Sequence, residues 1–379
     1  MGVNEFNSER LREAMLFREK TKTALAEEIG VSKQYIYKLE KGYKPSFETL
    51  INISKVLGFP RQYFFQKDTA EIQIYETFFR SSSTLTKRAR DAQEERITFI
   101  SKIYAVLNKY VNFPALNIPK IDVELSVEEQ AKQLREYWNI GDEPIKNIIY
   151  LLESNGVIVA TTKSQSGSID GYSSQRLHNN TKYSIVVLED DSKPFVRRQF
   201  SAAHELGHII NHHDMKYIFE RDEEREIENT ANDFASAFLL PKKAFLADLE
   251  YPKELSAYVN LKKKWNVSIS AMIRRAKDLE RISQNTYVSL NKRININNWR
   301  KIEPLDLEIP IKDPSSLRKS VELLLSEKIF TAKTLLQEFE ENGLKLTVEM
   351  IEELLNLEEG TLQYQETENV LDLEIRFRN

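Results

Sequence analysis

The sequence predicts a mainly α-helical protein with a small β-sheet, arranged as an N-terminal helical bundle, a central α+β domain and a small C-terminal helical module. Residues 8–66 hold short apolar-periodic runs separated by Gly and Ser, which is typical of a compact helical bundle. Two short runs rich in Val and Ile, at 157–160 and 183–188, have the composition of strands. Residues 305–379 carry helical spacing again, with Ser or Thr at the expected helix starts.

Length and composition narrow the class of protein. The 379 residues are enough for two or three domains, and 41% hydrophobic with 30% charged residues is ordinary for a soluble protein. No apolar run approaches the length of a membrane span, and the N-terminus lacks the apolar core of a signal peptide. Cysteine is absent, which excludes disulfide and thiolate chemistry. We therefore expect a cytoplasmic protein without membrane contact.

Within residues 8–66, a helix ending at Gly30 and a second helix capped by Ser32 form a helix-turn-helix unit. Basic and polar residues gather at the start and outer face of the second helix and just after it. These candidate DNA contacts are Lys33, Gln34, Tyr35, Lys38, Lys41 and Lys44. Because the net charge is −4, DNA contact must come from such a local patch. The alternative is a small bundle whose basic side chains are only solvated, or which binds another such bundle.

Residues 67–119 are predicted to be a helical linker. From Lys87 to Val111 the apolar positions recur at helical spacing, and Pro114 and Pro119 follow. This long amphipathic helix either connects two domains and offers a dimerisation surface, or packs on the core of the central domain. A homodimer is accordingly a candidate assembly, and the sequence does not separate the two alternatives.

The central domain is predicted to span residues 120–304. Its expected elements are two helices, two strands and an intervening Gly/Ser-rich loop, at residues 127–138, 145–153, 157–160, 183–188 and 164–174. A polar run over 291–298 is predicted to be a further loop. Either strand could pair with an extended peptide substrate, because a strand beside a catalytic helix can accept an added strand.

The stretch after the second strand contains His204-Glu205-Leu206-Gly207-His208, an H-E-x-x-H pentapeptide. On a helix, residues four apart lie on one face, so both imidazoles can reach one ion. Glu205 is the candidate general base, and Zn²⁺ fits best because it accepts nitrogen and carboxylate ligands. The pentapeptide alone also occurs by chance on surface helices. Here its flanks are apolar, and buried polar groups need partners.

A catalytic zinc ion requires a third protein ligand, and Glu228 is the favoured candidate. It lies at the edge of an apolar helical stripe in which Ala231 and Ala235 are small. Small residues would let this second helix approach the Gly207 face of the first closely. Alternatively, Glu228 is one more solvated charge in an acidic run, in which Glu224 is its nearest competitor.

Other third ligands remain open. Asp214 lies ten residues after His204, as in the metzincin pattern, but that pattern demands a turn-forming Gly where this chain has Asn211. His212 and His213 are further candidates, and we interpret both as a helix C-terminus, where His interacts well with the helix dipole.

Two residues are weaker candidates for stabilising the oxyanion that forms when water attacks a carbonyl. His178 falls in the predicted loop between the two strands and could donate to that oxyanion. A lone loop histidine is more often simply solvated. Tyr172 is a similar and equally weak candidate.

Three segments around these residues form a pattern far more specific than the pentapeptide. They are Phe200-x-x-Ala203-His204-Glu205-x-Gly207-His208, Glu228-x-x-Ala231-Asn232-x-Phe234-Ala235 and Leu239-Leu240-Pro241. This pattern resembles the ImmA/IrrE family of metallopeptidases. The resemblance implies a gluzincin-like α+β metallopeptidase domain with three zinc ligands, His204, His208 and Glu228, and with Glu205 as general base. It also implies helix-turn-helix repressors as substrates, cut at one bond.

A second resemblance covers residues 8–66. Ala24-Leu25-Ala26-Glu27-Glu28-Ile29-Gly30-Val31-Ser32, followed by Glu40-Lys41-Gly42 and Pro45, resembles the XRE/Cro-type repressor domain. The resemblance implies binding to operator DNA. The C-terminal residues 305–379 resemble nothing as specific. We expect them to form a small separate module that makes a protein contact or acts as a lid, with a terminal strand over 370–377.

Two functions follow as hypotheses. The first is a DNA-binding regulator with a zinc-dependent endopeptidase domain, which cleaves a repressor protein to derepress genes. The alternative is a transcriptional regulator that binds operator DNA and whose peptidase-like domain only senses a ligand. The first predicts chelator-sensitive cleavage of a repressor. The second predicts release of operator DNA when a small molecule or peptide binds.

Overall fold

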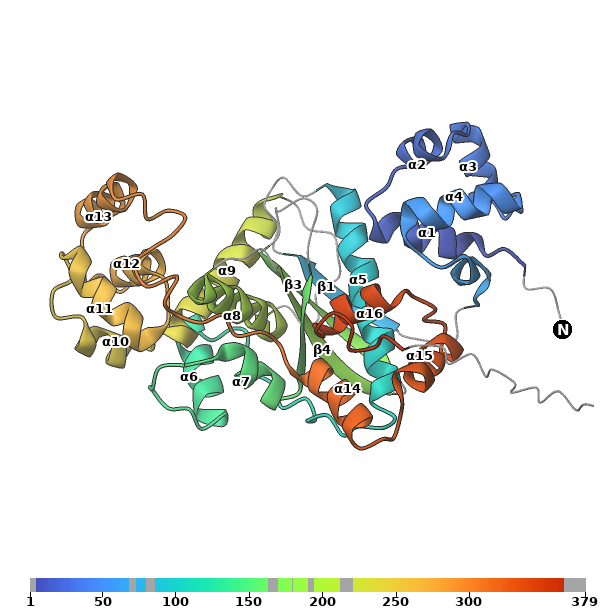
Figure 1. Ribbon diagram of the computed structural model, residues 1–379. Coiled ribbons are helices and arrows are strands. Elements are labelled where there is room, and N and C mark those ends of the chain that lie inside the picture. The colour runs from blue at the N-terminus through green and yellow to red at the C-terminus, as the bar shows by residue number, and fades with distance from the viewer. Residues whose placement is uncertain are drawn as a thin grey trace, which may run out of the picture.

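The computed structural model describes residues 5–67, 73–79, 86–162, 170–178, 180–189, 194–211 and 221–364. Over these residues the protein is mainly helical and contains one small sheet, as predicted, with the N-terminal bundle to one side of it (Figure 1). The described helices include none with the length and apolarity needed to cross a bilayer.

The N-terminal bundle has the helices that its capping residues and glycines predict. Thr21, Ser32 and Ser46 each cap a helix by accepting a hydrogen bond from a backbone N–H in its first turn. Gly30 and Gly58 end helices in the left-handed conformation that glycine adopts without strain. The elements are α1 (Ser8–Phe17), α2 (Lys22–Ile29), α3 (Lys33–Glu40), α4 (Phe47–Leu57) and the 3-10 helix η1 (Arg61–Phe65).

The sheet has four strands in the order β1-β3-β4-β2. They are β1 (Gln73–Phe79), β2 (Val157–Thr162), β3 (Gly171–His178) and β4 (Thr181–Glu189). Strands β2 and β4 were predicted and pair in parallel, whereas β3 pairs antiparallel with both β1 and β4.

Two strands differ from the prediction. The expected Gly/Ser-rich loop over 164–174 is wrong from Gly171 onward, because those residues open β3. The chain from 163 to 169 lies outside the described residues. The region predicted as a helical linker, 67–119, also contributes β1. Serine-rich β3 has low strand propensity, but both of its edges are hydrogen bonded to neighbours, and this pairing outweighs propensity.

Helical layers cover both faces of the sheet (Figure 1). Alternate residues point to opposite sides of a strand, so Ile185 and Val187 of β4 join one core, whereas Val186 and Leu188 join the other. The first core includes α5 (Lys87–Leu107), which begins at the residue where the helical spacing begins. The second core includes α8 (Phe195–Asn211), the helix that carries the pentapeptide.

Helix α5 also contacts the N-terminal bundle. Its Phe99 ring lies 5.3 Å from the ring of Phe17 in an edge-to-face arrangement. Its Arg96 donates to the Phe17 carbonyl at 3.3 Å and lies 3.5 Å from Glu19. Much of the apolar surface of α5 is therefore buried within the chain, between the bundle and the sheet, and this packing agrees with the second alternative for the long helix.

The helices that share the α8 core lie partly over the sheet and partly beyond it, at the left of Figure 1. They are α6 (Val127–Tyr137), α7 (Ile148–Ser154), α9 (Arg221–Leu239), α10 (Lys242–Asp248), α11 (Leu255–Trp265), α12 (Ile269–Asp278) and α13 (Gln284–Ile296). The loop predicted over 291–298 is wrong, because α13 runs through most of it. Leu290 and Ile294, one helical turn apart, are buried and hold that helix against the core.

The C-terminal residues form α14 (Ser316–Ser326), α15 (Ala332–Glu341) and α16 (Val348–Leu355). These helices were expected in a separate module, and that separation is wrong. Their apolar residues belong to the same core as α5 and the sheet. Glu153 of α7 also accepts hydrogen bonds from the backbone N–H groups of Ser315 and Ser316, at 2.8 and 2.7 Å. The strand predicted over 370–377 lies outside the described residues.

Candidate metal centre and nucleic-acid interface

The candidate metal centre is built where α8 and α9 cross. A Cβ atom at Gly207 would lie only 3.1 Å from both the Cα and the carbonyl oxygen of Ala231. Glycine on one helix and alanine on the other thus allow the two backbones to approach closely, as the small residues predicted. This close crossing brings a side chain of α9 to the histidine face of α8.

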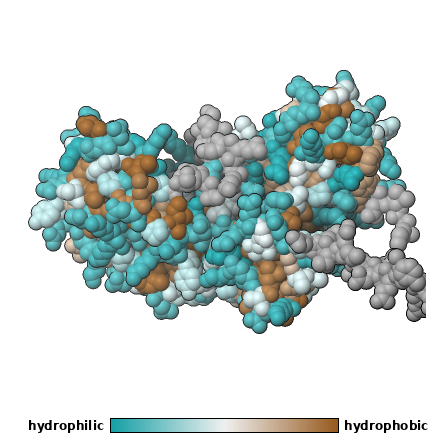
Figure 2. Space-filling model, viewed as in Figure 1, coloured by the Kyte–Doolittle hydropathy of each residue, from teal (hydrophilic) through white to brown (hydrophobic). Residues whose placement is uncertain are grey.

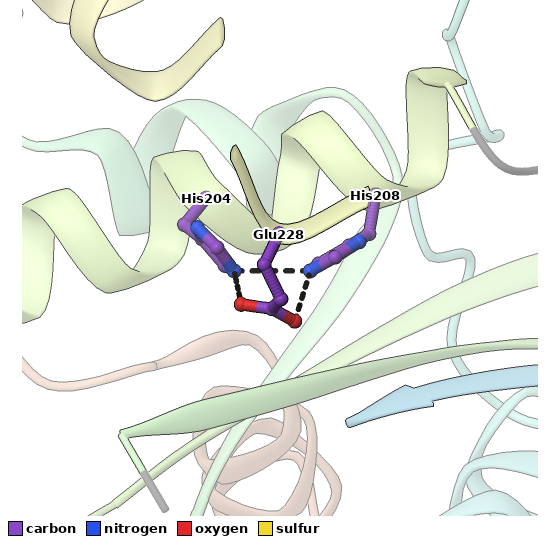
Figure 3. A group of neighbouring side chains, drawn as sticks. All are labelled: His204, His208 and Glu228. Atoms are coloured by element: carbon purple, nitrogen blue, oxygen red, sulfur yellow. Dashed lines mark hydrogen bonds and ion pairs between the residues drawn. The ribbon is translucent and has the colours of Figure 1, made fainter. Parts of the chain in front are cut away.

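Three side chains converge at this crossing (Figure 3). The Nε2 atoms of His204 and His208 lie 3.0 Å apart. The two carboxylate oxygens of Glu228 approach them, Oε2 at 3.4 Å from His204 Nε2 and Oε1 at 3.6 Å from His208 Nε2. Both imidazoles are buried. Two nitrogens and a carboxylate therefore face one common point.

A fourth side chain orients the first histidine. Asn232 lies one turn after Glu228 on α9, and its Oδ1 is 3.1 Å from His204 Nδ1. If Nδ1 donates its hydrogen to Asn232, the Nε2 lone pair of neutral His204 points to the shared centre. The sequence analysis did not identify Asn232 as the residue that orients His204. Two signals were available: Asn232 is part of the pattern that carries the resemblance, and its interval of four from Glu228 places both on the same face of α9.

Glu205 lies on the sheet side of α8. It follows His204, so its side chain leaves the helix about 100° further round the axis. The carboxylate is buried, and a Cβ atom at Gly171 of β3 would lie only 3.3 Å from Glu205 Oε1. The missing side chain at Gly171 lets the sheet approach this carboxylate closely.

The comparisons with known proteins agree with this architecture. Residues 152–277, which include the whole crossing, match the family model of the IrrE N-terminal-like domain, a peptidase family. Residues 11–64 match a helix-turn-helix family model. The chain fuses an XRE-type helix-turn-helix domain to an ImmA/IrrE-type domain. No curated protein matches it.

The donor set of the ImmA/IrrE-type domain suits a zinc ion. A tetrahedral ion with bonds of about 2.0–2.2 Å holds neighbouring ligand atoms about 3.3–3.6 Å apart. The three observed separations, 3.0, 3.4 and 3.6 Å, are close to that spacing. His204, His208 and Glu228 could therefore hold such an ion and leave a fourth position for a reacting molecule.

The two histidines keep Glu228 ionised. Burial is the largest single effect on this carboxylate, and it acts to raise the pKa. The hydrogen bonds from His204 and His208, together with their positive charges when the rings are protonated, exceed it and hold the pKa of Glu228 at about 2. At neutral pH the group is an anion, the state in which it can bind a cation.

The other candidate third ligands are not among the described side chains. His212, His213 and Asp214 lie outside the described residues, and so does the side chain of Glu224. Helix α8 remains helical through Asn211, where the metzincin pattern requires the chain to turn. The Asn211 side chain donates to the Gly207 carbonyl at 3.0 Å, as it would inside a continuous helix.

The oxyanion role expected of His178 stays a prediction, and the structure places this residue far along β3 from Glu205. His178 is the last residue of β3, seven residues from Gly171, and a strand of that length spans about 23 Å. The reason is that the predicted loop is a strand, which leads away from Glu205. Tyr172 is next to Gly171, but it is buried and points into the core shared with α5. Its pKa is raised, chiefly by burial.

In the helix-turn-helix domain, five of the six predicted DNA contacts are exposed, on α3 or in the turn after it. Lys33, Gln34 and Lys38 are exposed on α3, and Lys41 and Lys44 are exposed in the following turn. Tyr35 is partly buried and packs edge-on against Tyr43 at 6.4 Å. Figure 2 shows this domain with brown side chains among teal ones, and Phe47 and Tyr43 are among its exposed hydrophobic residues.

Proposed function

We propose that the ImmA/IrrE-type domain is a zinc-dependent endopeptidase. One observation carries the proposal, the convergence of His204, His208 and Glu228 at ligand spacing beside the buried Glu205. The sequence resemblance supports the same assignment, with these three residues as ligands and Glu205 as general base. The substrate that we propose is a helix-turn-helix repressor, which would be cut at one bond.

In the proposed reaction, Glu205 and Asn232 each have a separate role beside the zinc ligands. When bound, the zinc ion would polarise the scissile carbonyl and make a neighbouring water more acidic. Glu205 accepts the proton of the attacking water and passes it to the leaving amine, so its carboxylate ends the cycle unchanged. Asn232 holds His204 in the orientation that presents Nε2. The buried setting of Glu205 keeps bulk water from competing for that proton.

We further propose that the helix-turn-helix domain binds operator DNA through α3. The exposed lysines on α3 and after it suit phosphate oxygens, and Gln34 suits a base edge. DNA binding and proteolysis in one chain would make the protein a regulator that removes another regulator. The helix-turn-helix domain would then hold the peptidase domain at operator DNA.

The decisive test separates metal binding from proton transfer. A Glu205→Gln variant should bind zinc with unchanged stoichiometry yet cleave the repressors encoded beside its gene at least a hundredfold more slowly. A Glu228→Gln variant should lose zinc as well as cleavage. Zinc content is measured by elemental analysis after dialysis, and cleavage by mass spectrometry. Full cleavage by Glu205→Gln would exclude the assigned role. If no repressor is cut while operator DNA is released on ligand addition, the domain is a sensor.

A further inference from the structure

The sheet edge beside Glu205 is occupied by the chain itself. β3 begins at Gly171, whose backbone lies against the Glu205 carboxylate. On one side β3 pairs with β4, which is internal to the sheet, and on the other side it pairs with β1. β1 is therefore the outermost strand on the side of the sheet next to the candidate base. Figure 3 shows it, in blue, alongside the strand below the three ligands.

The register places the end of β1 beside the candidate catalytic centre. The pairing is antiparallel, with Thr77 opposite Ser174, Phe78 opposite Ser173 and Phe79 opposite Tyr172. Tyr172 directly follows Gly171. The backbone of β1 thus runs toward Glu205 and its last paired residue lies one position short of Gly171. This is the path that an extended peptide would take if it added to β3 to reach the catalytic residues.

The other outer strand offers no such path. β2 pairs in parallel with β4 at the opposite side of the sheet, and it contacts α14 and α16. The edge of β3 that pairs with β1 is therefore the edge that lies close to Glu205 and could pair with an extended peptide once β1 has left.

We propose that β1 is an internal competitor, which pairs with the β3 edge where the extended substrate segment binds and must leave before the substrate enters. The proposal rests on the peptidase function proposed above. It specifies the substrate as a segment recognised through main-chain hydrogen bonds in the antiparallel orientation. Such recognition tolerates many side chains, because each backbone unit offers the same donor and acceptor.

Two features make displacement feasible. β1 has a register shift between Ile74 and Glu76, whereas β3 and β4 pair without interruption from Gly171 to His178. Among the described strands, β1 has a neighbour on only one side. When it leaves, it therefore loses one ladder of hydrogen bonds, and water can replace these bonds. Because β1 is tethered, its effective concentration is on the order of millimolar, and a weak ladder still suppresses binding in trans.

The first test removes backbone donors. Successive residues of a strand point their N–H groups to opposite sides, so the double variant T77P/F78P loses one donor to β3 whichever residue faces it. T77A/F78A is the matched control, since it changes the same side chains and keeps both donors. The probe is a fluorescein-labelled synthetic peptide with the sequence of residues 70–82. In metal-free protein, anisotropy should report at least tenfold tighter binding to T77P/F78P than to wild type or T77A/F78A.

The second test locks the strand and does not depend on tolerance of proline. Opposed residues in antiparallel strands have Cα atoms about 4.5–5.5 Å apart, which a disulfide can span. The chain has no cysteine, so T77C/S174C would contain one defined pair. Oxidised T77C/S174C should bind the peptide at least tenfold more weakly than the same protein after reduction. Wild type should not respond to reductant.

The outcomes separate this proposal from the peptidase function. Equal peptide affinity for wild type, T77P/F78P and both redox forms of T77C/S174C would overturn the competitor role, even if a repressor is cleaved. Tighter binding to T77P/F78P and weaker binding to the oxidised pair would support it, even if no cleavage is ever seen. If cleavage occurs, T77P/F78P should also cut faster than T77A/F78A.

Discussion

At the scale of single residues, helical periodicity was enough to predict that the two candidate histidine ligands lie together. His204 and His208 share a face because they are four residues apart, and this geometry is local to one helix. Glu228 was harder, because its position depends on how closely α9 crosses α8, and the small residues Gly207 and Ala231 were the available clue. Asn232 was not identified, since its contact with His204 exists only after the helices cross.

Asn232 gives the first prediction of this scale. Asn232→Ala would remove the hydrogen-bond partner of His204 Nδ1, so the ring and its tautomer would be less well fixed. Loss of such an orienting partner costs about 10–100-fold in metal affinity. We expect that loss in zinc affinity, measured by competition with a chromogenic chelator.

The matched control is Asn229→Ala, an exposed asparagine on the same helix. It should leave zinc affinity unchanged. Equal affinities for Asn232→Ala and wild type would show that His204 does not need this partner, and would reduce Asn232 to a packing residue.

At the scale of elements, the strands were harder to predict than the helices. The expected helices at 127–138 and 145–153 appear as α6 and α7, because each carries its own apolar period and cap. β1 and β3 lack that signal, since a strand gains its stability from partners that are distant in the sequence. The unexpected placement of His178 in a strand has the same origin. A Ser- and Gly-rich segment was predicted to be a loop, and pairing on both sides made it a strand.

Helix α5 carries a group that should respond to pH. The pKa of Glu95 is raised from 4.5 to about 7, first by burial and then by the nearby carboxylate of Glu13 on α1. The folded protein therefore holds this proton more tightly than the unfolded chain. The resulting contribution favours folding below about pH 4.5 and is lost as the pH rises to about 7.

The prediction follows from that sign. Glu95→Gln should raise the free energy of unfolding at pH 8 by about 1–3 kcal/mol, because it removes a buried charge. It should also flatten the stability profile between pH 4.5 and 7, measured by chemical denaturation at each pH. Glu136→Gln, at an exposed position on α6, is the control and should change neither. A profile that keeps its slope in Glu95→Gln would assign the pH dependence to another group.

At the scale of the whole molecule, the net charge of −4 conceals a locally basic surface. Helix α3 lies on the part of the N-terminal domain that is away from the sheet (Figure 1), and its Lys33 and Lys38 are exposed. DNA bound at α3, as proposed, would lie on the side of the domain away from the sheet. Attraction to phosphate at this surface should depend strongly on salt, because binding releases condensed counterions.

This arrangement predicts a measurable salt effect. K33A/K38A should weaken binding to duplex DNA and reduce the slope of log affinity against log salt by about 2, one for each lost phosphate contact. Fluorescence anisotropy at several salt concentrations measures both quantities. Lys253→Ala, an exposed lysine in the ImmA/IrrE-type domain, is the control and should leave the slope unchanged. An unchanged slope in K33A/K38A would mean that DNA contacts another surface.

One buried apolar cluster runs from the N-terminal bundle through α5 into the sheet and on to the C-terminal helices. The polypeptide between residues 67 and 87 contributes β1 to the sheet, and it also links covalently two parts that are already joined by packing. A break of the chain in that interval would leave two fragments that stay associated until heat or denaturant parts them. Their separation would show in denaturing electrophoresis while gel filtration still reported a single particle.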